Sequence, residues 1–282
     1  MSTAVSTVEK SARSHATRRG SFAAALLAGC LLPLTSSTAQ QARPIDLSGV
    51  WSTAGLDTYG NPAWDIVGLF SCRCAAETYE YLDSILYDPV NDHMSAQDII
   101  EALEAHTFEV IARKLTDTGR TVGDAFDLAD DPAIQCERFP AFRTILHSDP
   151  IQFEVHDDRI VITGEDLTVD RTIYMDGRGH PETLEASPMG HSIGRYEGRS
   201  LVVETVGVAP GLVDDQLAVH NSDQARSVER YTLGPDGRQL NVEFTLYDPV
   251  MLKEPLTIRR PRVATPDVEL QKPPCAAIAG QY

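Results

Sequence analysis

The chain has 282 residues and a formal net charge of −17, with 41 acidic against 24 basic side chains. An acidic surface repels nucleic-acid phosphates and anionic lipids, so we expect no nucleic-acid partner. Hydrophobic residues make up 42% of the chain and charged residues 23%, which is typical of a globular protein. The longest apolar stretch is shorter than the roughly 20 residues that a spanning helix needs, so we expect no membrane span.

Residues 1–39 have the features of an export signal. Four bases and one acid precede the apolar run Phe22–Leu34, and the pair Arg18-Arg19 is typical of a twin-arginine signal. Two outcomes stay open: cleavage after Ala39, or lipidation at Cys30, where the sequence Leu-Ala-Gly-Cys resembles a lipobox. We favour cleavage because the apolar run continues beyond the cysteine. Either outcome predicts a periplasmic or secreted protein.

Cleavage would leave residues 40–282, a body of 243 residues with 40 acids and 20 bases, which one all-β domain can accommodate. This body keeps four cysteines: Cys72, Cys74, Cys136 and Cys275. In an oxidising compartment they allow two disulfides, and a bridge from Cys72 or Cys74 to one of the other two is favoured. The spacing of these cysteines does not match a zinc site, and we expect no metal and no other cofactor.

The sequence pattern in the N-terminal half of residues 40–282 predicts one strand followed by a long insertion. Residues 47–51 form the predicted strand, and the insertion covers residues 60–149. The insertion is mostly irregular by its pattern, except for one helix that starts at the N-cap Ser95 and runs to Leu115. An aromatic-rich segment that includes Trp64 predicts either packing against the strands or a lid over a ligand mouth.

From residue 150 onward, apolar and polar residues alternate between turn signals, which predicts strands. Asp157-Asp158 makes the first turn, Glu197-Gly198 the second, and Pro235-Asp236-Gly237 the third. The predicted strands are 151–155, 159–163, 167–175, 192–196, 200–206, 227–233, 239–247 and 256–263. Short strands joined mainly by turns favour an antiparallel meander that closes into a barrel or a sandwich.

The motif Gly49-Val50-Trp51 resembles the G-x-W motif of lipocalin-like barrels, in which a late-strand arginine stacks on the tryptophan. Arg260 or Arg262 would supply that arginine through a cation–π contact. The predicted fold is therefore mainly β: an antiparallel up-and-down, lipocalin-like β-barrel with a helical and irregular insertion after the first strand.

Two longer motifs carry a second resemblance. The segment Asp170-Arg171-Thr172-Ile173-Tyr174-Met175-Asp176-Gly177-Arg178-Gly179-His180-Pro181 is followed by Met189-Gly190-His191-Ser192-Ile193-Gly194-Arg195-Tyr196-Glu197-Gly198-Arg199-Ser200-Leu201-Val202-Val203-Glu204-Thr205. They resemble the "IYLDGRxHP" and "MGHSIGRWEGDTLVVET" motifs of a large family of uncharacterised exported bacterial proteins. The resemblance covers about residues 47–263. It implies a β-rich exported domain and no particular reaction. Tyr196 stands where that family usually has Trp, and Asn221 where a His is expected.

The two motifs also hold the candidate catalytic groups. Histidines titrate near neutral pH, so His191 is a candidate general base or acid, and Tyr174 or His180 a candidate proton donor. Glu204 lies in mid-strand, where a carboxylate is unusual; it is either a further acid or base, or paired with Arg195 or Arg230 across the strands.

The candidate ligand-binding groups are Arg171, Arg178, Ser192, Tyr196 and Trp64. Either arginine can hold a carboxylate or a developing enolate. The alternative is structural, because Asp-Gly-Arg is ordinary turn chemistry and a histidine can simply end a strand.

Three functions remain open. The first, which we favour, is a barrel that binds a small, largely apolar molecule. The second is a cofactor-free acid/base isomerase, lyase or hydratase that uses the same cavity, and the third is an interaction protein without a small-molecule site. The direction of the side chains discriminates between them, because neighbouring residues of a strand, such as His191 and Ser192, point to opposite faces.

Overall fold

The computed structural model describes residues 45–53, 73–165 and 170–272 of the chain. The chain divides into two units, Met1–Gln41 and Ala42–Tyr282, and every described residue belongs to the second. The predicted export signal, Trp64, Cys72 and Cys275 lie outside the described residues. Within the described residues, no helix is long and apolar enough to cross a membrane.

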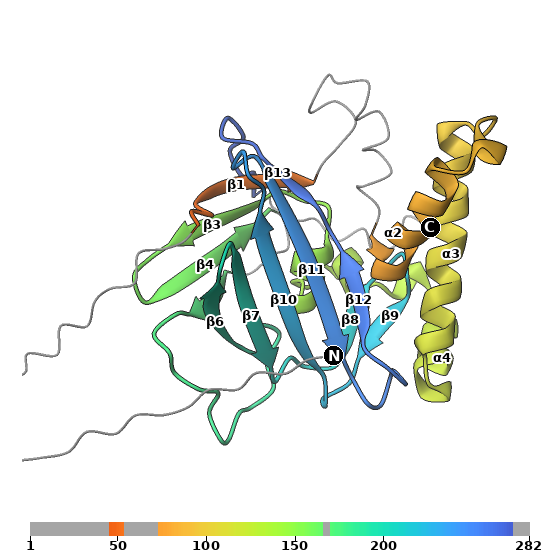
Figure 1. The fold of residues 1–282 in the computed structure, drawn as a ribbon. Helices are drawn as coiled ribbons and strands as arrows, with labels where there is room; N and C mark the ends of the chain where they lie inside the picture. Colours follow the sequence, from red (N-terminus) through yellow and green to blue (C-terminus); the bar gives the residue numbers. More distant parts are fainter. Residues whose placement is uncertain (1–44, 54–72, 166–169, 273–282) are drawn as a thin grey trace, which may run out of the picture. The chain divides into compact units, whose positions relative to one another are not determined.

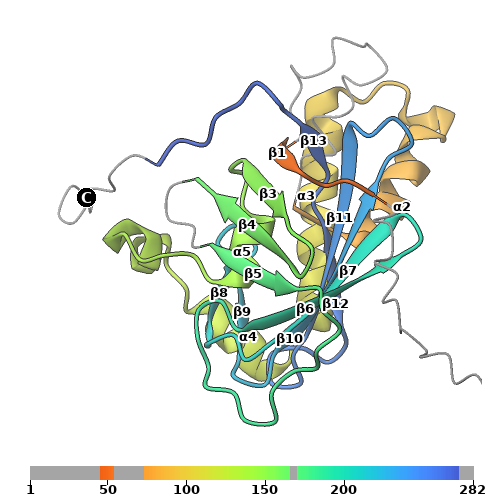
Figure 2. The same ribbon diagram turned by 90° about the vertical axis from the view of Figure 1, so that its left-hand side faces the viewer.

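Nine of the described strands close into a β-barrel (Figures 1 and 2). They follow one another around the ring in chain order, and the last pairs with the first. The strands are β1 (Gly49–Thr53), β3 (Ile151–Val155), β4 (Arg159–Gly164), β5 (Arg171–Tyr174), β6 (His191–Glu197), β7 (Ser200–Val206), β10 (Arg226–Leu233), β11 (Gln239–Tyr247) and β13 (Arg262–Ala264). The prediction of a mainly β barrel is confirmed.

The barrel is mixed, not wholly antiparallel as predicted, because β5 and β6 run parallel. A closed ring with an odd number of strands cannot alternate direction at every step, so at least one pair must be parallel. Parallel neighbours need a crossover of about a dozen residues or more, and residues 175–190 supply it. The local pattern of each strand contains no information about this crossover.

The hairpins follow their turn signals closely. The β6–β7 and β10–β11 pairs end within one residue of the predicted bounds, and Gly198 and Gly237 have φ values of +58° and +71°. One predicted strand is split: β12 (Leu256–Arg259) ends before Pro261, and β13 follows it. Proline has no N–H for a strand ladder, which explains the break.

Three further pairings between described strands lie outside the ring. β12 pairs with β11 and with the short strand β2 (Cys74–Ala75), while β8 (Gly211–Asp214) and β9 (Val219–Asn221) form a separate two-stranded sheet. Cys74 and Cys136 are both disulfide-bonded. Which cysteines pair stays a prediction.

The insertion is more helical than its sequence pattern predicted. The expected helix is α3 (Ala96–Lys114), and Ser95 caps it together with Asp98. Among the described residues, three more α-helices precede or follow it, together with three 3-10 turns. The helices are α2 (Ala76–Leu86), α4 (Asp117–Asp124) and α5 (Ala141–Leu146), and the turns are η3 (Pro89–Asn91), η4 (Leu128–Asp130) and η5 (Pro132–Gln135). Figure 1 shows α2, α3 and α4 beside β12 and β9. Helices α2, α4 and α5 are short, and tertiary packing contributes more to their stability than their own periodicity does.

The core has two parts, and α5 joins them. Trp51, Phe153 and Tyr231 belong to the cluster inside the barrel, to which α5 contributes Ile145. Phe142 and Leu146 of the same helix belong to a second cluster with Phe244 of β11 and residues of β8, β9 and β12. All six residues of α5 are buried. The barrel interior is thus filled with side chains around Trp51, which is 2% exposed.

Candidate functional site

The groups predicted from the two motifs divide between the two faces of the barrel wall. Arg171, Ser192 and Thr205 are buried and contact one another inside the barrel. Tyr174 lies three positions after Arg171 in β5, and His191 lies one position before Ser192 in β6. Because side chains alternate along a strand, Tyr174 and His191 face outward. The prediction that His191 and Ser192 point to opposite faces is confirmed. A single site therefore does not contain all the candidate residues.

Arg171 is the centre of a buried polar network. Its Nη1 and Nη2 atoms lie 2.9 and 2.8 Å from the two carboxylate oxygens of Glu229. Its Nε donates to Ser192 Oγ at 3.1 Å, and Nη2 donates to Thr205 Oγ1 at 2.6 Å. Tyr231 donates its hydroxyl to Glu229 at 2.5 Å.

The charges of Arg171 and Glu229 stabilise each other deep in the barrel, where their side chains are 1% and 0% exposed. Burial lowers the pKa of Arg171, but the Glu229 carboxylate outweighs this effect and holds that pKa above its usual value. A ligand would have to open this network to reach Arg171 or Ser192. Their predicted binding role stays a prediction.

The side chain of Arg262 contacts the backbone of Trp51 and not the tryptophan ring. Its Nη1 donates to the Trp51 carbonyl at 3.3 Å, whereas we expected a cation–π contact. The guanidinium also donates to the carbonyls of Ile145, His147 and Asp149 around the end of α5. The late-strand Arg262 thus meets Trp51 by a hydrogen bond to the tryptophan carbonyl instead of the expected cation–π contact.

Four predicted residues come together on the outer face as the histidine cluster: Tyr174, Arg178, His180 and His191. The Nδ1 atoms of His180 and His191 are 2.8 Å apart. The rings of Tyr174 and His191 are stacked with 5.2 Å between their centroids, and the Arg178 guanidinium lies 4.0 Å above the Tyr174 ring. Asp176 holds Arg178 in an ion pair.

The other predicted residues lie elsewhere. Glu204 lies on the outer face of β7, opposite Ile193 and Val228 in the two neighbouring strands. Tyr196 packs partly buried against the cluster inside the barrel. Catalytic or binding roles for these two residues stay predictions.

The contact between the histidines has the geometry of a hydrogen bond. Their ring centroids are 5.0 Å apart, which is nearly the longest separation that a 2.8 Å contact between two imidazole nitrogens allows. The two Nδ1 atoms therefore face each other head-on, and one must carry a hydrogen while the other accepts it. Among the described residues, no group of three or more His, Cys, Asp or Glu side chains is placed to hold a metal ion.

His191 has a pKa below the ordinary histidine value. Burial lowers its pKa, and the charges of His180 and Arg178 lower it further. Because His180 and His191 face each other directly, both cannot be protonated without losing their hydrogen bond and placing two like charges in contact. The hydrogen-bonded pair therefore accommodates at most one added proton.

The histidine cluster predicts a dependence of stability on pH. As the pH falls through 6.5, the ordinary histidine pKa, the unfolded chain takes up a proton at His191 before the folded chain does, so folding stability falls. We expect urea unfolding to show a smaller loss between pH 7.5 and 5.5 in His191→Phe than in the wild type. His156→Phe, at a half-exposed histidine beside Glu154, is the control. Equal losses in all three proteins would contradict the expectation.

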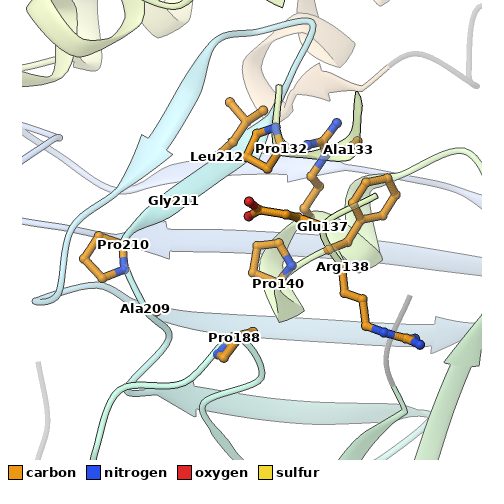
Figure 3. Close-up of a pocket in the computed structure, with 12 residues that line it drawn as sticks. Pro132, Ala133, Glu137, Arg138, Pro140, Pro188, Ala209, Pro210, Gly211 and Leu212 are labelled. Atoms are coloured by element: carbon orange, nitrogen blue, oxygen red, sulfur yellow. The ribbon is translucent and has the colours of Figure 1, made fainter. Parts of the chain in front are cut away.

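A cleft of about 160 Å³ lies outside the barrel, and no predicted site residue lines it (Figure 3). Its walls come from η5 and the segment that follows it, from α5, from the crossover before β6, and from the start of β8. The lining residues are Pro132, Ala133, Glu137, Arg138, Phe139, Pro140, Arg143, Pro188, Ala209, Pro210, Gly211 and Leu212. The four prolines come from three separate segments of the chain, so no single local motif marks this site.

The charged residues of the cleft have different surroundings. Arg143 is 4% exposed, makes two 2.6 Å hydrogen bonds to Asp131, and lies 4.4 Å from the centroid of the Phe139 ring. Figure 3 shows the Glu137 carboxylate pointing across the cleft toward Pro210 and Leu212, whereas Arg138 extends away from it. The cleft thus combines apolar walls with one carboxylate directed inward.

No family model and no curated protein matches this chain. The function must therefore be argued from the site.

Proposed function

We propose that the protein is an exported β-barrel protein that binds a small, largely apolar molecule, and that the ligand occupies the proline-lined cleft. The observation that carries the proposal is the cleft itself, in which four prolines, Phe139 and Leu212 form the walls. The barrel interior, where we first expected a ligand, is filled around Trp51 and Arg171. Ligand sites are typically concave and mostly apolar, with few polar groups.

The volume of the cleft limits the size of the ligand. A protein cavity of about 150 Å³ holds one benzene molecule, so 160 Å³ fits a single ring or a short chain. Proline restricts the backbone of the walls, and a preformed wall loses little entropy when a ligand binds. The proposal therefore concerns a compact ligand and excludes a long acyl chain or a polymer.

Filling the cleft tests the proposal. Gly211 lines the cleft, and a Cβ added there would meet its nearest atom, the Ala209 carbonyl oxygen, at 3.9 Å. Gly211→Val should therefore fold and occupy ligand space. In ligand-observed NMR with single-ring compounds, we expect the variant to lose at least about tenfold in affinity, because the added methyl groups overlap the ligand.

Gly179→Val is the matched control, since a Cβ at the exposed Gly179 meets nothing within 4 Å. Unchanged affinity in a folded Gly211→Val variant would contradict a ligand site in the cleft. If the wild type bound none of the compounds, the third hypothesis, an interaction protein without a small-molecule site, would be favoured instead.

The second candidate function is a cofactor-free acid/base enzyme. A site in the barrel cavity, as first expected, is contradicted because its groups lie on the outer face, so this candidate now concerns the histidine cluster. The lowered pKa of His191 and its contact with His180 favour it, because a neutral histidine accepts a proton at neutral pH. Tyr174 or His180 would donate a proton. Arg178 would replace Arg171 as the group that holds a developing anion, because Arg171 is inside the barrel. Turnover of a bound compound that His191→Ala abolishes would favour this candidate.

Export belongs to the proposal as well. It rests on the basic residues, the arginine pair and the apolar run of residues 1–39. We propose a periplasmic or secreted protein of the β-rich exported family that the two motifs resemble. Mass spectrometry of the protein from the cell envelope fraction would show whether the chain begins after Ala39 or carries a lipid at Cys30.

A further inference from the structure

We propose that the cleft selects ligands that carry an ammonium group, and that Glu137 binds this group. The inference rests on the proposed binding function and names the chemical class of the ligand: a compact organic cation with one small apolar body. It follows from the charges that line the cleft.

Glu137 is an exposed residue of the lining, and its carboxylate is directed across the cleft. Figure 3 shows its carboxylate pointing across the cleft toward Pro210 and Leu212. Within the part of the chain that the structure describes, no lysine, arginine or histidine forms an ion pair with Glu137. A carboxylate at the edge of an apolar cleft attracts a cation and repels an anion.

The two arginines of the lining do not reverse this preference. Arg143 is buried, and Asp131 neutralises it through contacts from both terminal nitrogens, with Asp215 3.9 Å away. Burial raises the pKa of Asp131, but its hydrogen bonds to Arg143 outweigh this and hold the pKa below its usual value, so the pair stays charged and mutually compensated. Arg138 extends away from the cleft.

The walls suit the apolar body of such a ligand. Pro132, Pro140, Pro188 and Pro210 present ring carbons, and Phe139 adds an aromatic side chain. The net charge of −17 raises the local concentration of small cations around the whole molecule, which supports their capture. A ligand that places its ring between the walls can direct a short ammonium arm to Glu137.

Three compounds of equal size test the inference: benzylammonium, benzyl alcohol and benzoate. Their affinities for the full chain are measured by ligand-observed NMR at low salt. We expect benzylammonium to bind about fivefold more tightly than benzyl alcohol, with benzoate weakest, as a partly exposed charge contact allows. This preference should shrink in 0.5 M salt because exposed charges are screened.

Glu137→Gln should reduce the difference between benzylammonium and benzyl alcohol to less than about twofold, and Arg138→Gln is the control that should keep it. Equal binding of the two compounds to the wild type would overturn the ammonium preference and leave the cleft as a binding site. Tighter binding of benzoate would do the same. If none of the three bound, the proposed binding function would fail together with this inference.

Discussion

Glu229→Gln is expected to lower the free energy of unfolding by about 3–5 kcal/mol, the usual cost of breaking a buried ion pair. The substitution keeps the shape of the side chain but leaves Arg171 charged inside the barrel, where its side chain is 1% exposed. It also removes the acceptor charge from the Tyr231 hydroxyl. Urea unfolding at neutral pH measures the effect.

The control for this prediction is Glu197→Gln on the barrel surface. Glu197 pairs with Arg195 and Arg230, and its side chain is 38% exposed, so the loss should be much smaller than for Glu229→Gln. The double variant Arg171→Met with Glu229→Met should be more stable than Glu229→Gln alone, because it removes both charges together. Equal effects of Glu229→Gln and Glu197→Gln would show that the buried pair contributes little.

Arg262→Met is expected to cost about 2–4 kcal/mol and to loosen α5. The guanidinium donates to Asp149 at 2.8 Å, His147 at 2.9 Å, Ile145 at 3.1 Å and Trp51 at 3.3 Å, in each case to the backbone carbonyl. Burial lowers the pKa of Arg262 to about 10, so it stays charged at neutral pH and complements the C-terminal end of the helix. Methionine would leave these buried carbonyls without their donor.

Hydrogen exchange of the α5 amides together with urea unfolding checks this prediction. Arg259→Met is the control: Arg259 forms a half-exposed ion pair with Glu243, and the same substitution there should cost less than about 1 kcal/mol. Because α5 also forms one wall of the cleft through Arg143, faster exchange should be accompanied by weaker ligand binding. Exchange of α5 at the wild-type rate in Arg262→Met would contradict the capping role.

Much of the barrel follows from local patterns. Strands such as Ser200–Val206 and Gln239–Tyr247 match their predicted bounds because alternation and turn residues act over a few positions. The parallel pair β5–β6, the split at Pro261 and helices such as α5 were missed. Each depends on closure of the ring or on packing against distant residues, and a window of a few residues contains neither.

The candidate site was predicted only in part. Tyr174, Arg178, His180 and His191 come from two neighbouring motifs and meet on the outer face. Arg171 and Ser192 come from the same motifs but face inward, as strand alternation requires. The sequence contained no sign that Glu229, nearly sixty residues after Arg171, would be its partner.

The sequence alone determined a mainly β barrel, the positions of its hairpins and the residues of the histidine cluster, because short-range periodicity and turn chemistry act locally. The tertiary structure alone decided that nine strands close with one parallel pair, that Arg171 is paired inside the barrel, and that prolines from three separate segments form a cleft with Glu137. These features depend on which distant residues meet. Those contacts form when burial of the apolar faces closes the ring, and the pattern of a single strand does not predict them.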